Sequence, residues 1–351
     1  MGIYDREYIR VGRRSGTGLA SLGLISVNSW IIILNIAVFV IDPFLGQFAR
    51  PVLVRQDIDP AMRGRALVIE RPPAQLPLVG RSVPLVIYDR ETGQAVGRRI
   101  YAVTPPMQAI GHFSTARAFV SFDPATNVVR ANTEIWRFIT FQFLHGSVTH
   151  IAFNMLGLWM FGGMVEQYLG GKRYAAFYLA CGIFGALSYL ILNFMGSQLG
   201  IRLPGVLPDS PYTPLVGASA GVFGVIMACA KIAPNAIVQL LFPPIPMKLK
   251  LMAYGYVALA TFNLLRGGHN AGGDAAHVGG AIAGAFFIRN AHLLRDFFDV
   301  FGRRSTSPAP PSRDEIDRLL EKVSSKGLAS LSESEKQMLR RESARRRSFD
   351  A

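Results

Sequence analysis

Long apolar stretches with almost no charge interrupt this chain, and they constrain its fold more than any other feature. A helix needs roughly 17 to 25 such residues to cross a bilayer. Six stretches qualify by apolar length and flanking charge, the last two being short: 24–46, 147–168, 174–196, 214–232, 250–266 and 275–290. With 50% hydrophobic and 17% charged residues, the chain has too little polar surface for a soluble globule. We therefore expect an all-α polytopic membrane protein with a bundle of six transmembrane helices.

Positive charge follows the pattern expected of membrane topology. Arginine and lysine crowd residues 1–14, the connection 171–173 and the C-terminal tail, whereas the connections 197–213 and 267–274 are poor in charge. The positive-inside rule then places both termini in the cytoplasm and the charge-poor connections outside. We interpret the net charge of +14 as topology and contact with membrane lipid, and we expect no nucleic-acid partner.

The first span argues against a signal peptide, and the two cysteines argue against a disulfide framework or a cysteine metal site. The first apolar run lacks a small-residue cleavage pattern and is long enough to span, so we interpret it as a retained anchor and not a signal peptide. Cys181 and Cys229 both fall within apolar stretches, which indicates neither a disulfide framework nor a cysteine metal site.

The spans divide the chain into successive parts. The predicted parts are a cytoplasmic N-terminus (1–23), the first transmembrane helix (24–46), an extracytoplasmic insertion (47–130), a core with five transmembrane helices (131–290), a linker (291–311) and a cytoplasmic helical tail (312–351). Alternating runs near 66–70, 83–88 and 95–101 predict a small β element in the insertion. The apolar run 134–145 is too short to span and favours a re-entrant or interfacial segment.

The tail carries two signals of short amphipathic helices. Ser312 with Glu315, and Ser332 with Glu335, have the spacing of a capping box, and Gly327 separates the two. The basic run after them either contacts anionic lipid or is simply solvated.

Ser219 is the candidate nucleophile of this chain. It lies near the start of the span 214–232, among Gly217, Gly221 and Gly224 and several alanines, so that other helices can approach it closely. Ordinary helix packing explains the small residues equally well when they are taken alone. A serine becomes nucleophilic only with a base in reach, so the remaining spans decide between the two interpretations.

Two histidines inside spans supply candidate partners for that serine. His277 opens the sixth span with Gly280 on the same helix face, which lets its helix approach another and makes it the candidate base. His150 and Asn154 open the second span four residues apart, so both can donate hydrogen bonds to an oxyanion. The alternative for the latter pair is a His–Asn contact that holds two helices together.

Topology brings these candidates to the same end of the membrane. Ser219, His277 and the pair His150 and Asn154 each follow an external connection, and the backbone N–H of Ser219 faces outward at its helix N-terminus. Asp274 is the carboxylate nearest His277 in sequence, but we expect it in the external loop, which favours a Ser219–His277 dyad over a triad.

The chain resembles the rhomboid intramembrane serine proteases over about residues 131–290. The resemblance rests on Glu134-Ile-Trp-Arg137, His145, His150-x-x-x-Asn154, Glu166-x-x-x-Gly170, Gly217-Ala-Ser219 and Ala276-His277-Val-Gly-Gly280. It departs from the usual pattern at Ala220 and at Phe223, where many members have glycine and tyrosine.

The resemblance implies a rhomboid-like six-helix fold and a function. Ser219 would be the nucleophile, His277 the general base and acid, and His150, Asn154 and the Ser219 backbone the oxyanion donors. Trp136, Arg137, Gly217, Phe223 and Gly280 would support the site. The reaction would be hydrolysis of peptide bonds in or beside transmembrane segments of single-pass or other membrane-protein substrates, without metal or cofactor.

The resemblance also implies a location for the site, and it leaves one alternative for the function. The site would open to the extracytoplasmic side of a bacterial cytoplasmic (inner) membrane. The alternative function is that of a catalytically inactive rhomboid-like protein that binds membrane clients.

Overall fold

The structure is a computed structural model of the chain, and it falls into two units, Met1–Phe297 and Phe298–Ala351. It describes residues 25–62, 65–71, 73, 78–123, 128–239, 245–295, 297–298, 313–327, 330–332, 334–336 and 338–339. The predicted cytoplasmic N-terminus (1–23), most of the linker and Ser312 lie outside these residues.

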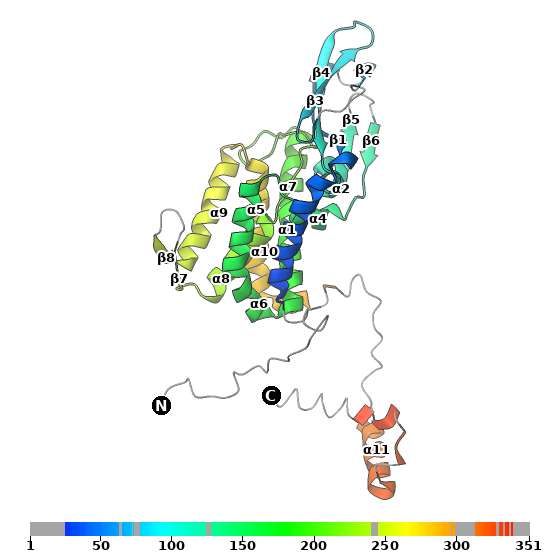
Figure 1. Ribbon diagram of the computed structural model, residues 1–351, viewed down its shortest axis with the longest axis vertical. Helices are drawn as coiled ribbons and strands as arrows, with labels where there is room; N and C mark the ends of the chain where they lie inside the picture. Colours follow the sequence, from blue (N-terminus) through cyan, green and yellow to red (C-terminus); the bar gives the residue numbers. More distant parts are fainter. Residues whose placement is uncertain are drawn as a thin grey trace. The chain divides into compact units, whose positions relative to one another are not determined.

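A bundle of helices forms the body of the first unit (Figure 1). Its helices are α1 (Val27–Phe44), α5 (Val148–Gly157), the π-helical turn η7 (Leu158–Gly162), α6 (Gly163–Leu169), α7 (Gly171–Ser197), α8 (Ser219–Ile232), α9 (Leu249–Leu265) and α10 (Ala271–Arg289). Three segments are long and apolar enough to cross a membrane: Val27–Phe44, Val148–Leu169 and Gly171–Ser197. α8 and α9 are apolar but shorter. The chain is therefore a helix-rich protein of the membrane type.

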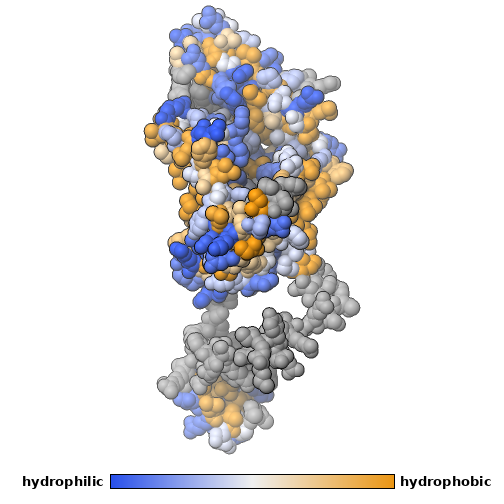
Figure 2. All heavy atoms as spheres, turned by 90° about the vertical axis from the view of Figure 1, so that its left-hand side faces the viewer, coloured by the Kyte–Doolittle hydropathy of each residue, from blue (hydrophilic) through white to orange (hydrophobic). Residues whose placement is uncertain are grey.

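The outer surface of the bundle is apolar, as a lipid-facing surface must be. Large hydrophobic side chains on α9 are exposed, among them Leu251, Leu259 and Phe262. On the face of the molecule seen in Figure 2, hydrophobic residues gather over the helical part. Such an exposed apolar surface is unusual in a soluble monomer and matches a bilayer.

Small residues let α10 pack directly against the backbone of α8. A Cβ added at Gly280 would lie 2.1 Å from the carbonyl oxygen of Ala220, and one added at Gly284 would lie 2.4 Å from that of Gly224. On the other side of α10, a Cβ at Gly279 would lie 2.6 Å from the Cβ of Ser188 on α7. α10 is thus wedged between α7 and α8 with no room for a methyl group at these positions.

α8 begins later than the sequence predicts. The apolar pattern places a span at 214–232, whereas the helix starts at Ser219. Leu215 instead pairs with Phe113 of the insertion through two backbone hydrogen bonds of 2.7 and 3.0 Å. Gly217 then adopts a φ of 132°, which excludes a helix there. Ser219 consequently occupies the first turn of its helix.

The insertion contains the predicted β element. Strands β1 (Arg50–Ile58), β2 (Leu67–Ile69), β3 (Ser82–Asp89) and β4 (Ala95–Thr104) form an antiparallel sheet in the order β1-β4-β3-β2. Val83, Leu85 and Val103 make its small core. The sheet stands at one end of the helix bundle (Figure 1).

Shorter elements complete the first unit. They are η4 (Gly46–Phe48), η5 (Pro60–Met62), α2 (Pro106–Gly111), α3 (Thr115–Ala118), β5 (Val120–Asp123), β6 (Val128–Ala131), α4 (Arg137–Thr140), η6 (Phe141–Phe143), the hairpin strands β7 (Ile237–Gln239) and β8 (Pro246–Lys248), and η8 (Ala291–Leu294). The segment 134–145, predicted to be re-entrant or interfacial, thus forms α4 and η6, with Phe141 and Gln142 fully buried.

Two carboxylates fix α1 at its opposite ends. Glu166 accepts hydrogen bonds from the backbone N–H groups of Val27 (2.7 Å) and Asn28 (2.9 Å), which caps the start of α1. Asp42, in the last turn of α1, accepts from the N–H groups of Met107 (2.8 Å) and Gln108 (3.1 Å) at the start of α2. Each carboxylate satisfies backbone donors that lack a partner within their own helix.

The second unit contains α11 (Arg313–Lys326), which ends before Gly327 at a φ of 76°. The capping box at Ser332 is confirmed: the Ser332 N–H donates to Glu335 Oε2 (2.8 Å), and the Glu335 N–H donates to Ser332 Oγ (3.3 Å). A hydrogen bond from Lys322 lowers the pKa of Glu335. The predicted box at Ser312 lies outside the described residues.

Candidate active site

Gly217 lies next to two of the candidate groups, the His150 ring and the Ser219 hydroxyl. A Cβ at Gly217 would lie 2.7 Å from Cε1 and Nε2 of His150 and 3.6 Å from Oγ of Ser219. The imidazole of His150 and the hydroxyl of Ser219 therefore both border the space beside this glycine. Its N–H donates to the carbonyl oxygen of Phe141 at 2.9 Å, which fixes the turn into α8.

His150 lies in the first turn of α5. Ser147 caps this helix, since its Oγ accepts from the N–H of His150 at 3.2 Å. One turn later, Asn154 Nδ2 donates to the carbonyl oxygen of His150 at 3.1 Å, so one amide hydrogen is used within the helix. The second amide hydrogen remains for another acceptor. His150 and Asn154 thus lie one turn apart near the start of α5, as their spacing predicts. The sequence analysis missed the cap at Ser147, for which the signal is a serine directly before an apolar run.

His277 lies in the second turn of α10 and faces α8. Its ring stacks on Phe223, with centroids 4.3 Å apart and planes 4° from parallel. Phe223 follows Ser219 by four residues, one turn along α8, so the stack holds the imidazole over the helix face that carries the serine. Among the described residues no hydrogen bond joins Ser219 to His277, and such bonds often form only when substrate binds.

Asp274 departs from its expected position. The sequence places it in the external loop, but α10 begins at Ala271, so Asp274 lies in the first helical turn with its side chain only 9% exposed. Its Oδ1 is 3.6 Å from Nδ1 of His277. The expectation of a loop was wrong because the glycine-rich run 271–273 is helical.

His145 is a buried neighbour of His150, whereas the sequence indicated only that it lies in a loop or at the edge of a span. The two rings meet edge to face with centroids 5.0 Å apart. Both ring nitrogens of His145 are buried without a hydrogen-bond partner in the described part of the chain.

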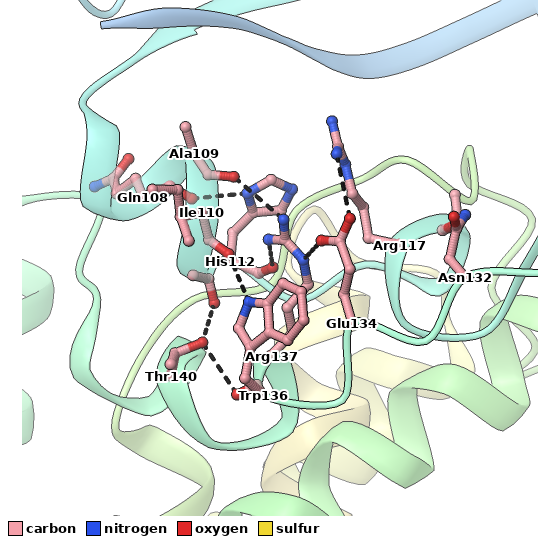
Figure 3. A network of polar contacts seen from close by, with 12 residues as sticks. Gln108, Ala109, Ile110, His112, Arg117, Asn132, Glu134, Trp136, Arg137 and Thr140 are labelled. Atoms are coloured by element: carbon pink, nitrogen blue, oxygen red, sulfur yellow. Dashed lines mark hydrogen bonds and ion pairs between the residues drawn. The ribbon is translucent and has the colours of Figure 1, made fainter. Parts of the chain in front are cut away.

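Arg137 and Trp136 fasten the segment before α5 to the insertion (Figure 3). Arg137, buried at 2% exposure, donates to the carbonyl oxygens of His112 (2.5 Å) and Ala109 (3.4 Å) and forms an ion pair with Glu134. Trp136 Nε1 donates to the carbonyl oxygen of Ile110 at 3.2 Å. Both side chains thus hold the backbone of residues 109–112 against the segment that precedes α5.

The same two segments, around Phe113 and Phe141, also bind the residues that lead into α8. Phe141, one turn after Arg137, accepts the N–H of Gly217, and Phe113, next to His112, pairs with Leu215. Sequence reasoning missed the Phe113–Leu215 pairing, and no local signal could have revealed a bridge between residues about 100 positions apart. Burial lowers the pKa of His112 to about 4, so its imidazole is neutral at ordinary pH.

The donor set offers no evident metal site. Within the residues that the structure describes, no three His, Cys, Asp or Glu side chains come together as metal ligands do. The candidate groups are instead the Ser219 hydroxyl at a helix N-terminus, the His150 imidazole beside Gly217 and the His277 imidazole stacked on Phe223. These groups can activate a nucleophile and stabilise a developing oxyanion.

Comparison with known proteins identifies two segments. Residues 132–292 match the family model of the Rhomboid domain, and residues 311–345 match a family of unknown function (DUF6576). Rhomboid protease GluP of Bacillus subtilis (strain 168) is 29% identical over 198 residues, which are 56% of this chain and 34% of that protein.

Two further relatives have similar identity. Rhomboid protease AarA of Providencia stuartii is 29% identical over 170 residues, 46% of this chain and 58% of that protein. The mitochondrial presenilin-associated rhomboid-like protein of Homo sapiens is 28% identical over 153 residues, 43% of this chain and 37% of that protein. The chain thus spans between 34% and 58% of the length of these relatives.

Proposed function

The chain is a member of the rhomboid family, and on that premise we propose that it is an intramembrane serine endopeptidase that uses a Ser219–His277 dyad. The substrates are membrane proteins, single-pass or otherwise, cleaved in or beside a transmembrane segment. No metal or cofactor takes part in the proposed reaction.

The stacking of His277 on Phe223 is the observation that carries this proposal. The imidazole lies against Phe223, the residue one turn after Ser219 in α8, and the missing side chain at Gly280 lets α10 lie against Ala220, next to the serine. A base within reach of a serine hydroxyl is the requirement for nucleophilic catalysis. Two helices that carried ordinary side chains at this crossing could not meet so closely.

The reaction proceeds in two stages. Nε2 of His277 takes the proton of Ser219 Oγ while the oxygen attacks the scissile carbonyl carbon, and the tetrahedral intermediate carries the charge on the former carbonyl oxygen. The His150 ring, the free Asn154 amide hydrogen and the Ser219 backbone N–H donate to that oxyanion. His277 then protonates the leaving amine, and water hydrolyses the acyl-enzyme by the same groups in reverse order.

Topology completes the proposal. Six spans with both termini in the cytoplasm would place the start of α5, α8 and α10 on the extracytoplasmic side, where the insertion sheet also lies. The ends of α1 support this arrangement, because Asp42 at its end binds the insertion and Glu166 binds its beginning. The membrane is the bacterial cytoplasmic membrane in this proposal, although relatives of similar identity are mitochondrial by name.

Cleavage in proteoliposomes tests the function. Wild-type protein should cleave a transmembrane substrate, and it should react with a fluorophosphonate at Ser219. Ser219→Ala and His277→Ala should abolish cleavage, and neither should be labelled. Cleavage by purified Ser219→Ala would refute the dyad, whereas a stable wild type that neither cleaves nor reacts would favour a client-binding rhomboid-like protein.

A further inference from the structure

We propose that a cavity between the insertion sheet and the connection from α7 to α8 binds the extracytoplasmic flank of the substrate, and that it selects flanks that carry lysine or arginine. The inference rests on the proposed function, because its occupant is a membrane-protein substrate. The cavity would bind the part of the substrate outside the membrane and would take no part in the chemistry at Ser219.

The cavity lies between two parts of the first unit that are far apart in the sequence. Its volume is about 640 Å³, and ligand sites commonly measure roughly 300 to 1,000 Å³. Its lining includes Asp57, Asp59, Arg98, Gly196, Arg202 and Asp209. Such a charged lining favours a polar occupant over an apolar one, because carboxylates and guanidinium groups lose hydration against an apolar surface.

The cavity also lies beside the path that the substrate would take. Gly196 and Ser197 in its lining end α7, and the connection 198–218 runs from there to Ser219 at the start of α8. Under the proposed topology, a substrate chain that leaves the membrane near Ser219 emerges on this side. The matched Rhomboid domain covers residues 132–292, so the sheet side of the cavity lies outside the segment that this chain shares with the family.

Buried hydrogen bonds hold the wall that the connection contributes. Asn193 of α7 is fully buried, and its Nδ2 donates to the carbonyl oxygen of Asp209 at 3.0 Å. Its Oδ1 accepts from the hydroxyl of Thr115 at 2.6 Å. The N–H of Ala116 donates to the carbonyl oxygen of Pro211 at 2.9 Å. A wall that is already in place binds an occupant at a lower entropic cost than a loop that must first be ordered.

Two carboxylates of the lining can receive a cationic side chain. Asp59 and Asp209 are both exposed, and across the described part of the chain neither takes part in an ion pair. Oδ1 of Asp59 accepts from the N–H of Ala61 at 2.9 Å, which holds this carboxylate at the end of β1 and leaves its other oxygen for a ligand.

The remaining charges of the lining leave a net negative cavity. Asp57 is shared between Arg55, at 2.9 Å, and Arg98, at 3.6 Å. Arg202 donates through Nη1 to the carbonyl oxygen of Gly196 at 3.2 Å and has no carboxylate partner among the described residues. Two unpaired carboxylates therefore stand against one unpaired guanidinium, and this excess favours a basic occupant.

A basic flank is a useful mark by which to select a substrate. The positive-inside rule concentrates lysine and arginine on the cytoplasmic side of membrane proteins, so they are less common in flanks on the other side. Carboxylates that bind such a residue would distinguish a minority of membrane proteins from the rest. The cavity would thus sort substrates by their flanks, independently of the sequence at the scissile bond.

The test compares cleavage of three single-pass substrates in proteoliposomes. They share one transmembrane segment and a glycine–serine flank that carries a pair of lysines, glutamines or glutamates. Because exposed ion pairs are individually weak, the KM of the wild type should be roughly two- to thirtyfold lower for the lysine flank than for the glutamine flank. The kcat should be the same for both, since a contact made equally in the ground and transition states changes KM alone. Equal KM values for the three substrates would overturn the inference.

Salt and variants then locate the contact. The preference for lysine should disappear in about 1 M salt, where the Debye length is about 3 Å. The double variant Asp59→Asn with Asp209→Asn should lose the preference, and Asp209→Lys should prefer the glutamate flank. Glu91→Gln is the matched control, at an exposed acid in the turn between β3 and β4, and should keep the wild-type preference. Retention of the lysine preference by the double variant would overturn the inference.

Two further measurements separate the possible failures. Thermal unfolding of each whole variant in detergent identifies a general loss of stability, which would alter KM for all three substrates alike. Fluorescence anisotropy of labelled flank peptides measures binding to the wild type without catalysis, and the lysine peptide should bind more tightly than the glutamine peptide. Equal binding of the three peptides would overturn the inference. Failure of the proposed function differs, since it appears as a wild type that cleaves none of the substrates and is not labelled at Ser219.

Discussion

A single methyl group at Gly280 should separate the two helices that carry Ser219 and His277. The Cβ of Gly280→Ala would lie 2.1 Å from the Ala220 carbonyl oxygen, 2.7 Å from its carbon and 3.0 Å from its Cα. All three atoms belong to backbone, which cannot rotate out of the way. Ordinary contact begins at 3.4 Å, so α8 and α10 must move apart by about 1 Å or more.

That displacement gives the expected magnitudes. Overpacking of this kind costs roughly 1 to 3 kcal/mol of stability. In domains of about 150 to 250 residues each kcal/mol lowers the unfolding temperature by roughly 2 to 4 °C, and in this longer chain of 351 residues the shift should be at the low end of that range. A misplacement of about 1 Å between reacting groups lowers catalysis by roughly 100-fold. Activity should therefore fall far more than stability.

Gly255→Ala is the matched control, because a Cβ at Gly255 in α9 would meet no atom within 4 Å. Alanine is the better helix former by about 1 kcal/mol, so this variant should be as stable as wild type or more so. Thermal unfolding in detergent and cleavage in proteoliposomes measure both quantities. If Gly280→Ala behaved like Gly255→Ala in both assays, the close helix crossing would not govern the site.

Other predictions concern the supports of the site. Arg137→Ala should destabilise the protein by roughly 3 to 5 kcal/mol, since it removes a buried ion-pair partner, whereas Arg117→Ala, at a 39% exposed side chain, should cost under about 1 kcal/mol in the same denaturation assay. Gly217→Ala should abolish cleavage without loss of the folded protein, because the added Cβ would strike the His150 ring. Its φ of 132° would also strain alanine by roughly 1 to 3 kcal/mol. Normal cleavage by this variant would contradict the prediction. The pKa of His112 falls from 6.5 to about 4 on folding, so the unfolded chain takes up the proton first and stability should decline by about 1.4 kcal/mol per pH unit as pH falls from 6.5 towards 4. Unfolding at several pH values should show this slope in wild type and a smaller one in His112→Gln, and equal slopes would contradict it.

The sequence predicted those features whose signal is local. Small residues repeated every three or four positions indicated which faces of α8 and α10 approach each other, and histidines inside apolar runs were conspicuous because such positions disfavour polar groups. The structure brings Ser219, His150 and His277 to one end of the bundle, and their roles stay a proposal. Alternation of apolar residues likewise predicted the runs that form β2, β3 and β4, but it did not indicate β1, which pairs with β4.

Features that depend on distant parts of the chain could not be predicted. Glycines at 272 and 273 favour a loop by propensity, but both belong to the first turn of α10, where Gly272 lies against Tyr189 of α7. Asp274 is therefore in a buried helical turn and not in a loop. The delayed start of α8 goes together with the pairing of Leu215 to Phe113, a residue about 100 positions earlier in the chain. Tertiary contacts of this kind override local preference and leave no periodic signal.

The register of the insertion sheet has a consequence for how this chain can vary. Arg50, the first residue of β1, pairs with Thr104, the last residue of β4, so the chain enters and leaves the sheet at the same place. The contacts that hold the end of α1 and the start of α8 lie outside that pair: Asp42 before it, and α2 with Phe113 after it. Within the pair, Asp57 and Arg98 of the sheet line the cavity together with Gly196 at the end of α7. A short turn joining residues 49 and 105 would therefore remove the sheet and that cavity, while the contacts of Asp42 and of Phe113 with the rest of the first unit could stay in place.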